Sequence, residues 1–184
     1  VANKRKVAYL SQQPSAYFSK ATVHDELSSV EKVAADDFEQ RRTYITELFH
    51  LEPLLHKSPT ALSGGQQQLV AFAKIFCLGA PITLLDEPTK GLDPHAKSLV
   101  GQAIQFMRSQ QMSILFVTHD VDFAAHYATH CAMLFQGTLT PTQDVHAFFA
   151  MNRFYTTSAR RIAYDQIDGV ITNEELLTIY EQQI

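Results

Sequence analysis

The chain has 184 residues and carries 15 Lys and Arg against 19 Asp and Glu, which gives a formal net charge of −4. Hydrophobic residues make up 46% and charged residues 18%, a balance typical of a globular protein with a sizeable core rather than of a disordered chain. Lys4-Arg5-Lys6 is the longest basic run, so the sequence offers no electrostatic footprint for nucleic acid. No apolar segment approaches the length of a membrane span. Cys77 and Cys131 lie far apart in apolar stretches, which predicts buried free thiols.

The first third of the chain has a mainly helical pattern. Residues 7–10 predict a short strand. Between 22 and 50, apolar residues recur at helical spacing among charged and polar ones, which predicts two helices, the first capped by Thr22. A further helix is predicted from Ser63 to about Leu78, where Gly79 ends it.

The pattern then changes to alternating strands and helices. Short, nearly continuous apolar runs at 82–85 and 114–117 predict strands buried on both faces of a parallel sheet. Helices are expected to follow them at about 94–109 and 121–128, which is the α/β doubly wound arrangement. Edge strands and a final helix are expected at 131–135, 138–140 and 173–182. A parallel sheet of so few strands would have an uncovered edge, so we expect the chain to start inside a domain, with further strands upstream.

The strongest local motif is Leu62-Ser63-Gly64-Gly65-Gln66, which opens a predicted helix. Ser63 can cap this helix, and the two glycines expose backbone N–H groups at its positive end. Such a helix start is suited to binding a phosphate. The alternative is a glycine-rich turn before an ordinary amphipathic helix.

Two further motifs place polar groups at the ends of predicted strands. The apolar run that starts at Pro81 ends in Asp86-Glu87-Pro88, at the strand end where open α/β sheets bind ligands. One carboxylate can hold Mg²⁺ and the next can orient an attacking water. The 114–117 run ends in Thr118-His119-Asp120, which places a histidine at a neighbouring strand end. The alternatives are a solvated acidic turn and a structural histidine.

The order and spacing of these motifs resemble those of ATP-binding-cassette (ABC) ATPases, over about residues 7–137. The matching segments are Leu10-Ser11-Gln12-Gln13-Pro14 for the Q-loop, Leu62–Gln66 for the signature, Leu84–Pro88 for the Walker B strand, Gly91-Leu92-Asp93 for the D-loop and His119 for the switch histidine. The resemblance implies a partial P-loop NTPase cassette, with a parallel sheet and an inserted α-helical subdomain. It implies ATP and Mg²⁺ as cofactors.

The resemblance also implies a role for each site residue. Asp86 would hold Mg²⁺, and Glu87 would polarise the hydrolytic water. Gln12 would sense the metal and the γ-phosphate, and His119 would contact that phosphate. Residues that would bind ATP held by a second cassette, or act across the same head-to-tail interface, are Ser63, Gly64, Gly65, Gln66 and Asp93.

A finer resemblance points to the energy-coupling-factor (ECF) importers of vitamins and metal ions. Asn152–Thr157 and Arg160–Ala163 resemble the C-terminal extension of that group. Thr89–Asp93, with Lys90 where many ABC ATPases have a small residue, resembles the second cassette of its duplicated ATPases. The alternative is a family-neutral tail.

The sequence departs from the family at the P-loop, which requires G-x-x-x-x-G-K-[ST]. None of the seven glycines is five residues from another, so the motif does not occur in the chain. We expect the N-terminal strands and the P-loop to be missing. The chain by itself is then expected to bind ATP weakly or not at all and to be inactive.

Two functions remain open at this stage. One is the distal part of an ABC ATPase that couples ATP hydrolysis to import of a small solute. The other is a non-catalytic partner that supplies its signature motif to another ATPase subunit. Retention of both Asp86 and Glu87 favours the first.

The expected organisation has four parts. They are 1–13, a strand and the Q-loop; 14–80, the helical subdomain with the signature helix; 81–140, the α/β core with Walker B, D-loop and switch histidine; and 141–184, a C-terminal extension. The expected partners are a second cassette and a transmembrane subunit that docks near the Q-loop and the helical subdomain. This implies a cytoplasmic protein at the inner face of the cell membrane.

Overall fold

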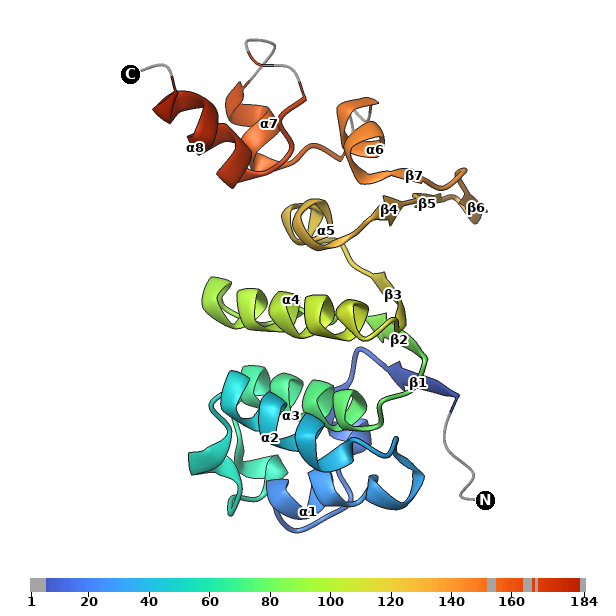
Figure 1. Cartoon of the computed structure of the whole chain (residues 1–184), viewed down its shortest axis with the longest axis vertical. Coiled ribbons are helices and arrows are strands. Elements are labelled where there is room, and N and C mark those ends of the chain that lie inside the picture. Colours follow the sequence, from blue (N-terminus) through green and yellow to red (C-terminus); the bar gives the residue numbers. More distant parts are fainter. Residues whose placement is uncertain (1–5, 152–154, 164–166, 168, 183–184) are drawn as a thin grey trace. The chain divides into compact units, whose positions relative to one another are not determined.

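A computed structural model describes residues 6–151, 155–163, 167 and 169–182 (Figure 1). The chain divides into two compact units, Val1–His119 and Asp120–Ile184. Within the described ranges, no helix combines the length and the apolar character that crossing a bilayer requires. Asn152, Arg153 and Phe154, which carried part of the ECF resemblance, lie outside the described residues.

A three-stranded parallel sheet forms the centre of the first unit. Its strands are β1 (Val7–Leu10), β2 (Ile82–Asp86) and β3 (Ser113–Val117), in the spatial order β1-β2-β3. The register pairs Leu10 with Leu85 and Leu85 with Phe116. The predicted strands and the predicted α/β fold with a parallel sheet are confirmed, and the carboxyl ends of all three strands lie at one edge.

Helices make up the rest of this unit. They are α1 (Val23–Ser28), α2 (Phe38–Leu48), α3 (Gly64–Cys77) and α4 (Pro94–Ser109), with 3₁₀ turns η1 (Pro14–Tyr17), η2 (Glu31–Val33), η3 (Glu52–Leu54) and η4 (Pro59–Ala61). Both α3 and α4 pack on the sheet and on each other, and α2 packs on both of them (Figure 1). An aromatic cluster joins the three helices. The rings of Tyr44 and Phe106 lie 4.2 Å apart, and the ring of Phe76 lies 5.6 Å from that of Phe106. All helices predicted in this unit are present.

The two faces of the sheet differ in burial, which corrects one prediction. Ala8, Leu10 and Leu85 point to the helix-covered face and are at most 2% exposed. On the opposite face, Tyr9 is 50% and Leu115 is 63% exposed. The strands are therefore not buried on both faces, although their sequences are apolar on both. The physical reason is that a parallel sheet needs helices on each face, and α3 and α4 both lie on the same one.

Helix α3 begins and ends where the sequence predicts. The Ser63 hydroxyl accepts a hydrogen bond from the Gln66 N–H at 3.3 Å, and the Gln66 side chain accepts one from the Ser63 N–H at 3.1 Å, a capping box. At the other end, Gly79 has φ of +58°. This left-handed conformation ends the helix, and glycine adopts it without strain. Burial of Cys77 on the same helix raises the pKa of its thiol to about 12, as expected of an inert core thiol.

The described residues of the second unit form short strands and helices. Its elements are α5 (Val121–Tyr127), β4 (His130–Cys131), β5 (Leu134–Phe135), β6 (Thr138–Leu139), β7 (Gln143–Asp144), α6 (Val145–Met151), α7 (Ser158–Ala163) and α8 (Asn173–Glu181). The single strand expected at 131–135 is two strands. Cys131 pairs with Gln143, whereas Phe135 pairs with Thr138 around the Gln136-Gly137 turn. Thr172 and Glu175 form a capping box at the start of α8.

Two small apolar clusters stabilise the second unit. Phe149 and Ile171, both 1% exposed, belong to one of them, and Ala159 and Val170 belong to the other. Cys131 borders the first cluster and is only half-buried, so the expected burial of both thiols holds fully for Cys77 alone. The four-part functional division of the chain has different boundaries from these two compact units, and it stays a prediction.

Candidate functional site

Three predicted site residues lie at the same edge of the sheet. Gln12 follows β1 by two residues, Asp86 is the last residue of β2, and His119 follows β3 by two residues. Because the three strands are parallel and adjacent, their carboxyl ends bring these side chains together. This edge is the candidate functional site.

Asp86 forms hydrogen bonds with polar groups from β1 and from the residues that follow it. The Gln12 carboxamide donates to one Asp86 oxygen at 3.3 Å, and the Tyr9 hydroxyl donates to the other at 3.5 Å. Partial desolvation, followed by the negative charge of Asp86, raises the pKa of Tyr9 above its ordinary value. The carboxylate and the amide of this pair are hard oxygen donors of the kind that Mg²⁺ prefers. This donor set fits the predicted metal role, although no group of three or more His, Cys, Asp or Glu with metal-binding geometry occurs among the described residues.

Glu87 links the ends of β2 and β3. Its backbone has φ of +51°, an unusual conformation for a residue other than glycine, and its N–H donates to the Val117 carbonyl at 2.8 Å. Its carboxylate accepts hydrogen bonds from the Thr118 hydroxyl at 3.3 Å and from the His119 N–H at 3.1 Å. The imidazole Nδ1 of His119 lies 2.9 Å from the same carboxylate. Glu87 is thus held by three groups that follow β3.

The side chains of Glu87 and His119 differ in their exposure to solvent. The side chain of Glu87 is 13% exposed, whereas that of His119 is 79% exposed. The carboxylate is therefore fixed within the protein, and the imidazole is open to solvent. An exposed imidazole beside a held carboxylate can exchange its partner for another anion, such as a phosphate oxygen.

Gln68 supports the turn after β2 and was not singled out from the sequence. Its side chain is 2% exposed, and its carboxamide donates to the carbonyls of Pro88 at 3.1 Å and Glu87 at 3.4 Å. A buried amide with two backbone acceptors fixes the turn on which Glu87 stands. The available signal was a polar residue on the apolar face of a helix, two residues beyond the signature motif.

The remaining predicted residues form a second group, at the start of α3 and beside it. The first turn of α3 lies against the turn after β2, where a Cβ built on Gly65 would lie 3.4 Å from the Gly91 carbonyl oxygen. A Cβ built on Gly64 would meet nothing within 4 Å, so the backbone there is open on its outer side. Asp93 caps α4 by accepting from the Ala96 N–H at 2.8 Å. In this structure Asp93 caps the start of α4, and Ser63 and Gln66 cap the start of α3.

Comparison with known proteins identifies the family of the N-terminal half of the chain. Residues 2–90 match the family model described as ABC transporter. The chain is 34% identical over 173 residues to a protein of Bacillus thuringiensis subsp. konkukian assigned as an ABC transporter ATP-binding protein. Residues 2–90 belong to the ABC transporter family, as an ATP-binding cassette. The energy-coupling factor transporter ATP-binding protein EcfA2 of Latilactobacillus sakei subsp. sakei is 32% identical over 159 residues, which cover 84% of this chain and 55% of that protein.

Solved structures share the fold. One is cbiO1 of Clostridium perfringens, part of the ABC transporter complex cbiONQ, with a TM-score of 0.68 and 23% identity over 86% of this chain and 63% of that one. Another is a dimeric ATP-binding cassette in a post-hydrolysis state bound to ADP and Pi, with a TM-score of 0.64 and 24% identity over 76% of this chain and 63% of that one.

The relatives are longer than the chain. The Bacillus protein is matched over 94% of this chain but over only 31% of its own length. The chain therefore spans about a third of that cassette protein.

Proposed function

We propose that the chain is the distal part of an ABC transporter ATPase whose catalytic edge is the carboxyl end of the β1-β2-β3 sheet. The observation that carries this proposal is the meeting of Asp86, Gln12, Glu87 and His119 at that edge, from three different strands. A structural role alone would not require two adjacent carboxylates, one of them held in a left-handed backbone conformation.

Each residue then has a definite part in hydrolysis. Asp86 and Gln12 hold Mg²⁺, which when bound neutralises charge on the phosphates. Glu87 orients the attacking water, and the bonds from Thr118 and His119 keep its carboxylate aimed at one place. His119, with its exposed imidazole, turns from Glu87 to the γ-phosphate.

A second cassette completes the nucleotide site in this proposal. The first turn of α3 offers backbone N–H groups and the positive end of a helix to the phosphates of ATP held by the partner. Gly64 leaves that approach open, and Asp93 acts across the same interface. The fold shared with a dimeric cassette that binds ADP and Pi is compatible with this arrangement.

The finer assignment is an ECF-type importer of a vitamin or metal ion, with this chain as the second cassette of a duplicated ATPase. Similarity to EcfA2 supports it, and the fold shared with cbiO1 of the cbiONQ complex is compatible with it. The transmembrane subunit docks on the helical subdomain, which places the protein at the cytoplasmic face of the membrane.

Hydrolysis by the assembled transporter tests the proposal. We expect Mg²⁺-dependent ATP hydrolysis that falls at least ~100-fold in Asp86→Asn, because the metal loses its carboxylate. The matched control is Glu31→Gln, which neutralises an exposed carboxylate on η2 and should leave the rate unchanged. Equal rates in Asp86→Asn and in the wild type would overturn the proposal.

The chain alone provides a second test. Without a G-x-x-x-x-G-K-[ST] segment it should neither bind ATP tightly nor hydrolyse it, and sequencing the source gene upstream of the Val1 codon should reveal that motif in frame. A stop codon with no such motif would favour the alternative, a non-catalytic partner that supplies its signature helix to another ATPase.

A further inference from the structure

Glu26 is a fully buried carboxylate in the helical part of the first unit. Its side chain has no exposed surface, and Lys74, from the last turn of α3, approaches it to 2.5 Å. A buried charge is costly unless it is paired and hydrogen-bonded, and the Glu26 carboxylate meets both conditions. Neither residue belongs to the motifs described above.

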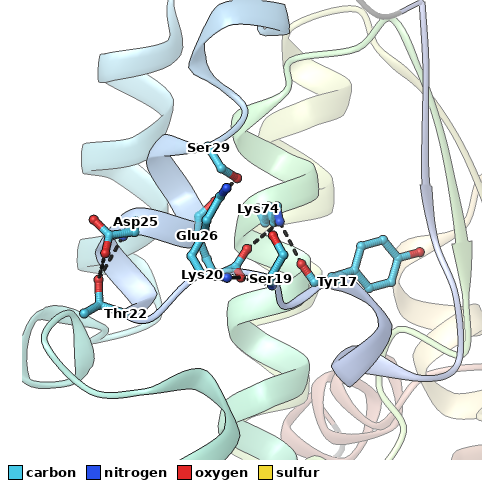
Figure 2. Close-up of polar contacts among 8 residues, drawn as sticks. All are labelled: Tyr17, Ser19, Lys20, Thr22, Asp25, Glu26, Ser29 and Lys74. Atoms are coloured by element: carbon cyan, nitrogen blue, oxygen red, sulfur yellow. Dashed lines mark hydrogen bonds and ion pairs between the residues drawn. The ribbon is translucent and has the colours of Figure 1, made fainter.

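The pair holds the segment that follows the Q-loop. One oxygen of Glu26 accepts hydrogen bonds from the backbone N–H groups of Ser19 and Lys20. The ammonium of Lys74 donates to the other oxygen and, at 2.7 Å, to the Tyr17 carbonyl (Figure 2). Three backbone groups within four residues are thereby bound to the buried Glu26 and the partly buried Lys74.

Tyr17 links these contacts to β1 and the residue that follows it. Its hydroxyl accepts from the Ser11 N–H at 2.7 Å and donates to the Tyr9 carbonyl at 2.9 Å. Gln12 is the next residue along the chain, and its carboxamide contacts Asp86. A continuous set of hydrogen bonds therefore runs from Lys74 and Glu26, through Tyr17, to the backbone that carries Gln12.

We propose that Lys74 and Glu26 are positioning residues that hold the 11–20 segment so that the Gln12 carboxamide lies beside Asp86. The inference rests on the proposed function for the role of Gln12 toward the metal. It goes beyond that function because it assigns the positioning of Gln12 to two residues outside the motifs, one buried and one partly buried.

The positioning can be tested on the chain itself by amide hydrogen exchange. In Lys74→Met, which keeps the apolar stem but removes the ammonium, exchange across residues 11–20 should become at least about tenfold faster. Exchange in β2 and α4 should stay within about threefold of the wild type. Lys74→Arg keeps a positive charge and two N–H donors at this position, so its exchange should match the wild-type rate. The matched control is Lys32→Met, which removes an exposed ammonium from η2 and should change nothing.

A milder variant tests the same proposal if Lys74→Met does not fold. Tyr17→Phe removes only the hydroxyl that joins Ser11 and Tyr9, so exchange of the Ser11 amide should rise at least about tenfold in a folded protein. Unchanged exchange at 11–20 in folded Lys74→Met, or at Ser11 in Tyr17→Phe, would overturn the proposal.

The catalytic consequence is measured separately in the assembled transporter. Lys74→Met should raise the Mg²⁺ concentration needed for half-maximal hydrolysis about tenfold, with a smaller change in KM for ATP, and Lys74→Arg should reverse this. A purely structural role would lower the rate without shifting the Mg²⁺ requirement, and that result would overturn the proposal. If the wild type hydrolyses no ATP, the proposed function fails, and the exchange measurement still decides whether the two residues hold the segment.

Discussion

Glu87 shows how one side chain can be fixed before any substrate arrives. Its backbone N–H extends the hydrogen bonding between β2 and β3, and both of its carboxylate oxygens accept bonds from residues that follow β3. Gln68 holds the carbonyls of Glu87 and Pro88 through its buried carboxamide. The left-handed backbone of Glu87 persists because these contacts determine it from several sides. A carboxylate held in this way can orient a water molecule without further reorganisation.

Replacing Glu87 by glutamine keeps the shape of the side chain and removes its charge. We expect the hydrolysis rate of the assembled transporter to fall about 100-fold or more in Glu87→Gln, because a neutral amide is a much weaker base and acceptor. Binding of ATP should stay within a few-fold of the wild type, since Glu87 acts on the water and not on the nucleotide. Steady-state hydrolysis and equilibrium nucleotide binding measure the two effects. Full activity in Glu87→Gln would remove Glu87 from the catalytic step.

At the level of elements, α3 is the part on which the site depends most. Its first turn carries the signature motif, its second turn supplies Gln68, and its last turn supplies Lys74 before the chain turns at Gly79 toward β2. Apolar packing against α2, α4 and β1 holds the helix in place. One helix therefore connects the start of α3 to the turn after β2 and to the segment that follows β1.

Gly79 is predicted to be the least replaceable glycine of the first unit. A Cβ there would lie 2.7 Å from the Cβ of Ala35 and 2.9 Å from Nε of Arg41, in a backbone with φ of +58°. Gly79→Ala should cost about 2–4 kcal/mol of unfolding free energy, of which about 1 kcal/mol is backbone strain. Gly91→Ala is the matched control, because Gly91 has φ of +73° with nothing within 4 Å, and should cost only about 1 kcal/mol. Denaturant unfolding of both variants measures the difference, and equal losses would contradict the packing argument.

The sequence predicted elements and motifs better than contacts. The three strands of the parallel sheet and the caps of α1 and α3 follow from local sequence patterns, and they were found. Lys74 and Gln68 bind backbone carbonyls that lie 57 and 20 residues away in the sequence. Such pairing has no periodic signal. The exposed face of the sheet was mispredicted for a related reason: an apolar strand shows that it can be buried on both faces, not which helix covers each face.

At the scale of the whole molecule, the two groups of site residues serve different nucleotides in the proposed function. Gln12, Asp86, Glu87 and His119 gather at the edge of the sheet, and the start of α3 presents Gly64 outward. A cassette that uses both groups needs a second cassette arranged head to tail. Activity is therefore expected to depend on Ser63 even though Ser63 lies outside the metal-binding edge.

Ser63→Arg tests this dependence. The large cation fills the approach to the first turn of α3 and removes the hydroxyl that accepts from Gln66, so hydrolysis by the assembled transporter should fall at least about tenfold. Loss of the cap alone costs about 1 kcal/mol of stability, too little to unfold a domain of ordinary stability. Ser63→Thr keeps a capping hydroxyl and should retain activity within about threefold, which separates phosphate contact from helix stability. Hydrolysis measured across a range of cassette concentrations gives the decisive readout, because a sandwiched nucleotide requires two cassettes. Full activity in Ser63→Arg, with an unchanged concentration dependence, would contradict nucleotide binding by the signature helix.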